Sequence, residues 1–246
     1  MPTFAARALG ILRECRGFAL AFVAFLAIRS FVFQPFTIPS DSMEPTLRVG
    51  DYMIVSKASY GWSRRSLPFS LWPFHGRIVA GAPHWGEVVV FKRGDGREDV
   101  VKRLIGLPGD RVQLTGGVVR VNGAPLRQQV LGPARDPDQP SRAVIAIRET
   151  MADGRSHTIL RDPLEREGET TGVYVVPQGR YFLLGDNRDN SADSRWPRPI
   201  GMGFVAAEDL EGKAEFVAFG WRGGARFWNP WTWVSRFDPS RMFRPI

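Results

Sequence analysis

Two short segments of the sequence carry residue types that could together attack a covalent bond. Ser40 and Ser42 lie in IPSDSMEPTL, and the two prolines of that segment favour a stiff turn that exposes both hydroxyls. Lys102 lies in VVKRLI, a β-branched and apolar run typical of a strand. A serine attacks when a neighbouring base removes its proton, and a lysine can be that base where burial lowers its pKa. Taken alone, each segment is more typical of ordinary solvated side chains.

A third segment, GDNRDNSADSR at 185–195, concentrates charge in one loop that follows an apolar run. Such a loop is usually solvated, but it could instead form a buried network of ion pairs that fixes neighbouring groups. Its charged residues are Asp186, Arg188, Asp189, Asp193 and Arg195.

Other hydrolytic chemistries have little support in the sequence. The three histidines form no His-Glu-x-x-His pattern, and a single cysteine cannot build a thiolate cluster. No Gly-x-Ser-x-Gly turn occurs either. We therefore expect neither a metal nor another cofactor. Composition leaves a serine–histidine–aspartate triad open, although no histidine lies in an informative setting. The three histidines are His75, His84 and His157, and the cysteine is Cys15.

The segments that must position these side chains are short β-branched runs, without a long helical period after residue 38. Gly116-Gly117 and Asn122-Gly123 separate three of the runs, as in antiparallel hairpins. The fold class expected is mainly β: an antiparallel catalytic sheet with an inserted smaller β subdomain, preceded by one N-terminal transmembrane helix. The expected strands are 51–57, 87–92, 100–105, 111–115, 118–121, 173–176, 180–184 and 213–219.

The middle of the chain differs in composition from the rest. Residues 127–172 are rich in charge, proline and glycine, with weak strand patterns only at 143–148 and 157–161. We expect this part to be more exposed than the catalytic sheet. The expected domains are a catalytic β-domain at 37–112 and 181–246 and an inserted subdomain at 113–180.

An apolar run before the β-rich part predicts a membrane anchor at 17–36. About 20 helical residues cross the hydrocarbon layer, and this run carries one charge, Arg29. Arginines precede it, so the positive-inside rule places residues 1–16 in the cytoplasm and the part after the run outside. A cleavable signal peptide and a buried core helix are the alternatives. The net charge of +8 then suits an anionic lipid bilayer, and not nucleic acid, as the partner.

Together and in this order, the segments resemble those of bacterial type I signal peptidases. IPSDSMEPTL is similar to the family's nucleophile box, GDYMIVSK to its next box, KRLIGLPGD to its base box and GDNRDNSADSR to its final box. Each box is moderately specific, and four of them behind an apolar run are very specific. The likeness covers roughly residues 29–112 and 181–220. One small departure is Glu87, where relatives often carry aspartate.

The resemblance implies a serine–lysine mechanism without a cofactor. Ser42 would be the nucleophile and Lys102 the general base. Ser40 would add its hydroxyl to an oxyanion hole formed with the Ser42 backbone N–H, and Ser191 would hydrogen-bond to Lys102 and orient it. The supporting ion pairs would be Asp193 with Arg195 and Asp186 with Arg103.

The resemblance also implies the substrates and the location. The substrates would be exported preproteins that carry signal peptides, cleaved after small residues at −1 and −3. They would add to an exposed strand edge along the Ile-Pro-Ser stretch and 51–57, with pockets at Ile38, Pro39 and Met43. The enzyme would span the inner membrane once, with its catalytic domain on the outer, periplasmic face.

Three alternatives remain at this point. One is a specialised serine–lysine peptidase that processes a single exported substrate. Another is a self-cleaving repressor, although the apolar run stands where that class carries a helix-turn-helix. The last is a non-enzymatic, membrane-tethered β-domain that binds envelope partners.

Overall fold

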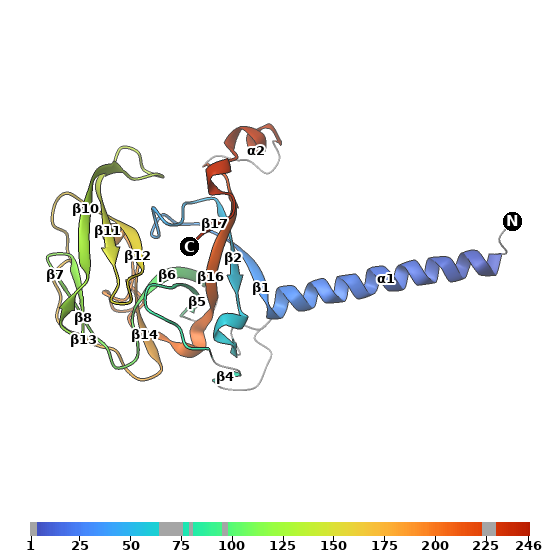
Figure 1. Cartoon of the computed structure of the whole chain (residues 1–246), viewed down its shortest axis with the longest axis horizontal. Helices are drawn as coiled ribbons and strands as arrows, with labels where there is room; N and C mark the ends of the chain where they lie inside the picture. The colour runs from blue at the N-terminus through green and yellow to red at the C-terminus, as the bar shows by residue number, and fades with distance from the viewer. Residues whose placement is uncertain (1–3, 64–75, 79–80, 95–97, 223–229) are drawn as a thin grey trace.

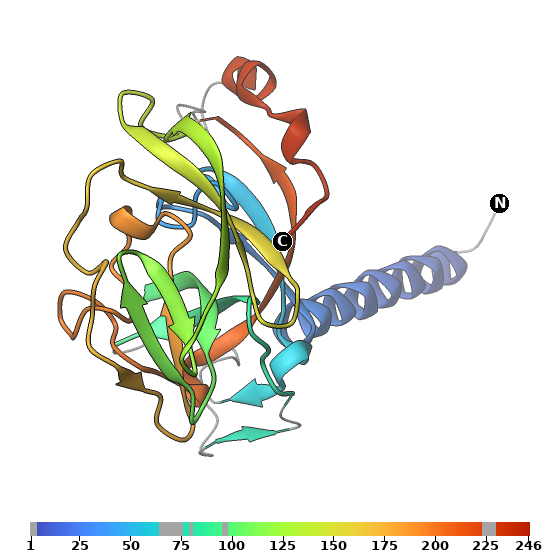
Figure 2. The ribbon, with the colours of Figure 1, turned by 60° about the vertical axis from the view of Figure 1, so that its left-hand side comes forward.

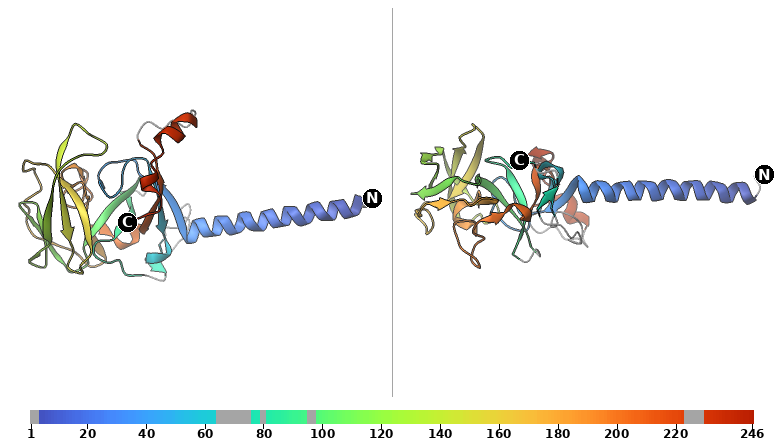
Figure 3. Two further views of the ribbon diagram at one scale, coloured as in Figure 1. Left: turned by 45° about the horizontal axis from the view of Figure 1, so that its top comes forward. Right: turned by 90° about the horizontal axis from the view of Figure 1, so that it is seen from below.

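A computed structural model describes residues 4–63, 76–78, 81–94, 98–222 and 230–246. One long helix, α1 (Phe4–Phe31), projects from a body made of β-strands (Figure 1). Both views of Figure 3 show α1 pointing away from that body. Among the described residues, no helix combines the length and the apolar character needed to cross a membrane.

The largest sheet has eight antiparallel strands and carries the segments singled out in the sequence. Its order is β1-β2-β16-β5-β6-β14-β15, and β17 pairs with β16. The predicted class, a mainly antiparallel β fold, is confirmed. The strands are β1 (Phe33–Thr37), β2 (Asp51–Ser56), β5 (Val88–Arg93), β6 (Glu98–Gly106), β14 (Arg180–Leu184), β15 (Val205–Ala206), β16 (Leu210–Gly220) and β17 (Arg244–Pro245).

The smaller sheets lie mostly between β6 and β14 in the sequence, and in Figure 2 their green and yellow strands form a layer in front of the large sheet. Two of them have the orders β13-β7-β8-β9 and β10-β11-β12, and β3 pairs with β4. The strands are β3 (Trp62–Ser63), β4 (Arg77–Ile78), β7 (Arg111–Thr115), β8 (Val118–Val121), β9 (Ala124–Pro125), β10 (Arg127–Arg135), β11 (Ala143–Thr150), β12 (Ser156–Arg161) and β13 (Tyr174–Val175). In the described part of the chain, the other helical pieces are α2 (Pro230–Arg236) and 3-10 turns at Ala58–Tyr60, Arg188–Asn190, Ala207–Asp209 and Pro239–Arg241.

Turn chemistry explains the hairpins that the sequence indicated. Asn122 and Gly123 both have positive φ, at 55° and 85°, as a two-residue turn between twisted strands requires. They join β8 to β9, which pair through Val121 and Ala124.

Strand β10 was not expected, because its sequence contains glycine and proline. It pairs with β11 along its length, with an irregularity between Val130 and Gly132. Since β10 lies at the edge of its sheet, Pro133 can stand in it without removing a required hydrogen bond.

The N-terminal apolar segment divides into two structures, which corrects the expected single helix at 17–36. The helix ends at Phe31, and Phe33–Thr37 forms β1, the edge strand that pairs with β2. Pro35 lacks the N–H that would continue a helix, whereas an edge strand accepts it.

Two apolar clusters hold the large sheet, one on each face of β5. Val88 and Val90 pack in the cluster that also contains Met43 and Leu47. Val89 joins the other cluster, because successive side chains of a strand point to opposite faces. The segment 38–47 is therefore anchored in the core on one face of the sheet.

Candidate active site

The hydroxyl of Ser42 and the amine of Lys102 meet although 60 positions separate them in the sequence. Ser42 lies in the turn after β1, and Lys102 lies on β6, paired with Val89 of β5. Lys102 Nζ donates a hydrogen bond to Ser42 Oγ. Ser42 is 9% exposed and Lys102 is 3% exposed, so water has little access to either.

Burial lowers the pKa of Lys102 to about 8. The charges of Asp193 and Asp186 act in the opposite direction, and those of Arg93 and Arg195 add to the lowering. A buried ammonium is destabilised relative to the neutral amine because the apolar interior solvates charge poorly. At a pH near this value a large share of Lys102 is therefore neutral, as a general base must be.

A second hydroxyl stands beside the first. Ser40 Oγ lies 3.4 Å from Ser42 Oγ, and Ser40 is exposed. Ser40 is thus on the open side of Ser42, where an incoming group would arrive.

Two buried ion pairs flank the Ser42–Lys102 contact. Asp193 binds Arg195 through both carboxylate oxygens, at 2.8 and 2.9 Å, and also accepts the Gly185 N–H at 3.1 Å. Arg195 further donates to the carbonyl of Arg188. These contacts close the 185–195 loop on itself.

The other pair joins this loop to β6. Arg103 donates to both oxygens of Asp186, at 2.8 and 2.6 Å, and to the Gly86 carbonyl at 2.6 Å. Thr46 Oγ1 donates to the same carboxylate at 2.5 Å. Thr46, which the sequence analysis did not single out, thereby ties the end of the nucleophile segment to the loop.

Ser191 does not make the hydrogen bond to Lys102 that was expected. Its hydroxyl is shielded from solvent, and no described residue is its hydrogen-bond partner. It packs against Gly185, where a Cβ would come within 2.3 Å of Ser191 Oγ and 2.6 Å of the Ser42 carbonyl oxygen. Ser191 is therefore next to the backbone of Ser42, and the close packing at Gly185 holds it there.

A family model described as signal peptidase, peptidase S26, matches residues 12–219 of the chain. The chain belongs to this family. The matched stretch contains every candidate catalytic residue, so the predicted resemblance and the predicted enzyme class, a signal peptidase, are confirmed.

Curated relatives agree with this assignment of the signal peptidase. The signal peptidase I of Rickettsia typhi is 37% identical over 216 residues, which are 84% of this chain and 80% of that protein. The signal peptidase I of Rickettsia akari is 39% identical over 211 residues, 81% of this chain and 77% of that protein. A crystal structure of a signal peptidase I from Enterococcus faecalis is 26% identical, with a TM-score of 0.31, covering 54% of this chain and 96% of that chain.

The three residues expected to contact substrate in this signal peptidase differ in exposure. Pro39 is exposed, but Ile38 and Met43 are 3% and 1% exposed and belong to the apolar core. Ile38 and Met43 therefore pack in the core, and their contact with substrate stays a prediction. Their hydrophobic side chains gain more from packing against the neighbouring strands.

The expected binding edge at 51–57 also needs correction. Strand β2, which covers most of that range, is paired on both sides, with β1 and with β16. Its backbone groups are used within the sheet, so a substrate strand cannot add there.

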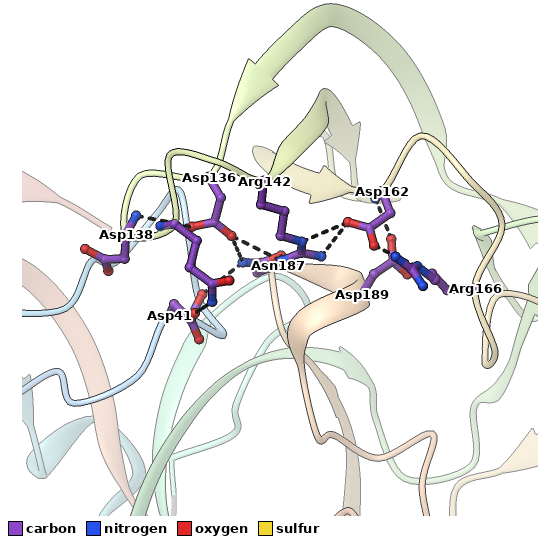
Figure 4. Close-up of polar contacts among 9 residues, drawn as sticks. Asp41, Asp136, Asp138, Arg142, Asp162, Arg166, Asn187 and Asp189 are labelled. Atoms are coloured by element: carbon purple, nitrogen blue, oxygen red, sulfur yellow. Dashed lines mark hydrogen bonds and ion pairs between the residues drawn. The ribbon is translucent and has the colours of Figure 1, made fainter.

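Other polar residues near the nucleophile were missed from the sequence. Asn187 donates its backbone N–H to the Ser42 carbonyl at 3.1 Å. Its side chain contacts Asp136 and Arg142 from the β10–β11 hairpin (Figure 4). Asn187 lies within the 185–195 segment, whereas the hairpin residues lie in the stretch 127–172, which is predicted to be exposed, and carry no local signal of this contact.

Of the histidines, His84 and His157 are described, and no hydrogen bond joins either to Ser42 within the described part of the chain. His157 has a pKa lowered to about 3 by burial, with the charge of Arg103 acting in the same direction. His75 lies outside the described residues.

Proposed function

We propose that this signal peptidase removes signal peptides from exported preproteins by a Ser42–Lys102 dyad. The single observation that carries the proposal is the hydrogen bond between Lys102 Nζ and Ser42 Oγ in a buried site. A lysine with a pKa of about 8 is a usable base, whereas a solvated lysine near 10.4 is not.

In the proposed reaction, neutral Lys102 accepts the proton of Ser42 as Oγ attacks the carbonyl carbon of the scissile peptide bond. The negative charge that develops on the carbonyl oxygen is stabilised by the Ser42 N–H and the Ser40 hydroxyl. The ammonium of Lys102 then gives its proton to the leaving amine, and the C–N bond breaks. Water, deprotonated by Lys102, hydrolyses the ester on Ser42 and restores both residues.

The substrate would bind as an extended strand between two segments of the chain. One is the stretch 38–40, which follows edge strand β1 and leads to Ser42. The other is the first half of β6, because β14 pairs with β6 only from Arg103 to Gly106. Among the described strands, Glu98–Lys102 is paired on one side only, with β5, which leaves its other backbone edge for a peptide. The small residues at −1 and −3 would then face the protein surface together.

We also propose that α1 holds the enzyme at the membrane from which its substrates emerge. From residue 15 onward its apolar side chains are solvent-exposed, including Phe18 at 78%, Phe22 at 62% and Phe25 at 58%. Exposed aromatic rings in such numbers favour an apolar environment. Ser42 follows the last helical residue, Phe31, by 11 positions (42 − 31), so the site would lie near the outer surface.

Cleavage of a purified preprotein in detergent tests the dyad. We expect Ser42→Ala and Lys102→Ala to lose about 10³-fold or more in kcat while keeping wild-type melting temperatures. The control is Ser235→Ala, which removes an exposed hydroxyl on α2 and should leave kcat unchanged. Cleavage by the Lys102 variant at near wild-type rate would remove the dyad from consideration.

Membrane attachment is tested separately on the full chain expressed in cells. We expect the wild type to stay with the membrane pellet after alkaline carbonate extraction. Changing Phe22 and Phe25 together to Asp should release it, because charged side chains are costly in the hydrocarbon layer. The proposal about α1 is wrong if the wild type is extracted as readily as the double variant.

A further inference from the structure

We propose that Asn187 is a positioning residue that orients the peptide group between Asp41 and Ser42, and that the tip of the β10–β11 hairpin holds Asn187 in place. The hairpin tip is the segment 136–142 of the inserted subdomain. The inference rests on the proposed function, because this peptide group carries the Ser42 N–H of the oxyanion hole. Through this contact, the inserted subdomain would contribute to catalysis.

Asn187 contacts the nucleophile segment twice. Its side-chain Nδ2 donates to the Asp41 carbonyl oxygen at 3.3 Å, and its backbone N–H donates to the Ser42 carbonyl oxygen at 3.1 Å. The Asp41 carbonyl and the Ser42 N–H belong to one rigid, planar peptide group. A donor that fixes the carbonyl end of this group therefore fixes the direction of the N–H at the other end.

The side chain of Asn187 is itself held at both ends. Nδ2 also donates to Asp136 Oδ2 at 3.1 Å, and Oδ1 accepts from Arg142 at 3.2 Å. An acceptor at one end and a donor at the other allow only one orientation of the amide. Asn187 and Asp136 are both 0% exposed, so water does not compete for these bonds.

Hydrogen bonds within the hairpin tip hold the groups that meet Asn187. Asp136 accepts the backbone N–H groups of Asp138 and Gln139 at 3.2 and 3.1 Å and forms an ion pair with Arg142 at 3.1 Å. Gln139 reaches the nucleophile segment directly and donates to Asp41 Oδ2 at 2.7 Å. Figure 4 shows Asp136 and Arg142 of the tip meeting at Asn187.

Beyond the tip, the same network reaches β12 and returns to the catalytic loop. Arg142 binds Asp162 Oδ1 at 3.0 and 2.5 Å, and Asp189 accepts the Asp162 N–H at 2.7 Å. The arginine is thus fixed from a second side (Figure 4). Each bond in this chain is polarised by the next, so the network is expected to act as a unit.

The functional consequence concerns the transition state. An oxyanion hole works because its donors are already directed at the position of the developing charge. Without Asn187 the 41–42 peptide group could rotate, and part of the Ser42 N–H interaction would be lost. Before the attack, the carbonyl oxygen of the scissile bond carries no developing negative charge, and binding of the substrate depends on other groups. Loss of the Ser42 N–H interaction should therefore lower kcat and leave KM unchanged.

The test compares Asn187→Ala and Arg142→Met with the control Arg148→Ala in the full-length enzyme. Arg148 is an exposed arginine on β11 of the same hairpin, with one hydrogen bond to Gln129. We expect kcat to fall about 10–100-fold for Asn187→Ala and about 3–10-fold for Arg142→Met, with KM within about twofold of wild type. Arg148→Ala should match the wild type.

A second readout separates positioning from general structural damage. A peptide boronic acid that ends in alanine forms a tetrahedral adduct whose oxygen occupies the oxyanion hole, whereas the cleaved product peptide does not. We expect the inhibition constant of the boronic acid to rise about tenfold or more in Asn187→Ala, and that of the product peptide to stay within about twofold. Equal weakening of both inhibitors would overturn the inference.

The outcomes also separate this inference from the proposed function. If the wild type does not cleave the preprotein, or if Ser42→Ala still does, the dyad is wrong. If the dyad behaves as expected but folded Asn187→Ala keeps wild-type kcat, the positioning role is wrong. Should Asn187→Ala fail to fold, Arg142→Met decides, because the Arg142 side chain is partly exposed and its loss is better tolerated. Wild-type kcat in that variant contradicts the inference.

Discussion

Lys102 and Arg103 are neighbours on β6, yet their side chains take part in different interactions, Lys102 with Ser42 and Arg103 with Asp186. Successive residues of a strand point to opposite faces, so one strand supplies both the proposed base and an ion pair that fixes the 185–195 loop. Both side chains are buried. A shift of β6 by one residue would exchange the two faces and disrupt both interactions.

Activity should depend on pH through Lys102. Burial lowers its pKa to about 8, and only the neutral amine accepts the Ser42 proton. We therefore expect kcat/KM to rise as pH increases from 6 to about 8 and to level off above that value. The measurement is a pH profile on a short peptide substrate without ionisable groups. A profile that is flat from pH 6 to 10 would contradict the proposed role of the lysine.

The Arg103–Asp186 pair should contribute strongly to stability. Burial raises the pKa of Asp186, but the charge and hydrogen bonds of Arg103, together with His157 and Thr46, lower it more, so the net shift is downward. Arg103→Met leaves this buried carboxylate without its ion-pair partner and with only the hydrogen bond from Thr46, which should cost about 3–5 kcal/mol in the free energy of unfolding. Urea denaturation at pH 7 measures it.

The matched control for that prediction is Arg166→Ala. This arginine also pairs with an aspartate, Asp162, at 2.8 Å, but its side chain is 59% exposed. Its loss should cost no more than about 1 kcal/mol. The pKa of Asp186 is lower in the folded protein than in the unfolded chain, so its ion pair with Arg103 stabilises the fold at pH values above the unfolded pKa. The wild type should lose the stability contributed by this pair as pH falls below about 4. If Arg103→Met and Arg166→Ala lower the free energy of unfolding equally, the buried pair does not matter more than the exposed pair, and the prediction is wrong.

Gly185 should be sensitive to the smallest enlargement. A Cβ at this position would lie 2.3 Å from Ser191 Oγ and 2.6 Å from the Ser42 carbonyl oxygen. Gly185→Ala must therefore displace the backbone of the nucleophile, and we expect kcat to fall by about 10²-fold. In Gly172→Ala the new methyl group meets no atom within 4 Å, so this control should keep wild-type activity. Comparable kcat values for the two variants would refute the prediction.

Glu44 should be protonated in the folded enzyme. It is fully buried, and burial, with the nearby Asp138 and Asp136, raises its pKa to about 11. Neither carboxyl oxygen accepts a hydrogen bond from a described donor. Above pH 4.5 the unfolded chain has lost a proton that the folded chain keeps, so this group lowers stability as pH rises.

Glu44→Gln removes that dependence, because an amide has no proton to lose. The variant should be more stable than the wild type by up to roughly 3 kcal/mol at pH 7, with little difference at pH 4.5. Denaturant unfolding at both pH values measures this change. Glu167→Gln, at an exposed position, should stay within about 0.5 kcal/mol of wild type. The measured quantity is the stability of Glu44→Gln minus that of the wild type at each pH. If this difference is smaller at pH 7 than at pH 4.5, the Glu44 carboxyl is ionised in the folded enzyme and the prediction is wrong.

The sequence by itself determined the class of fold and pointed to the proposed chemistry. Ser42, Lys102 and the 185–195 loop lie in segments whose order along the chain resembles that of a known family, and this order can be read without coordinates. The strand runs and the Asn122-Gly123 turn were also predictable, because hydrophobic period and turn conformation are properties of neighbouring residues.

Only the tertiary structure decided which segments meet. It places Asn187 against Ser42 and also against Asp136, which is 51 positions away from Asn187 in the sequence. It also pairs β2 on both sides within the large sheet. It also makes a strand of the proline-containing residues 127–135, through pairing with β11. Such contacts depend on long-range hydrogen bonds and shared burial, and local propensity does not encode them.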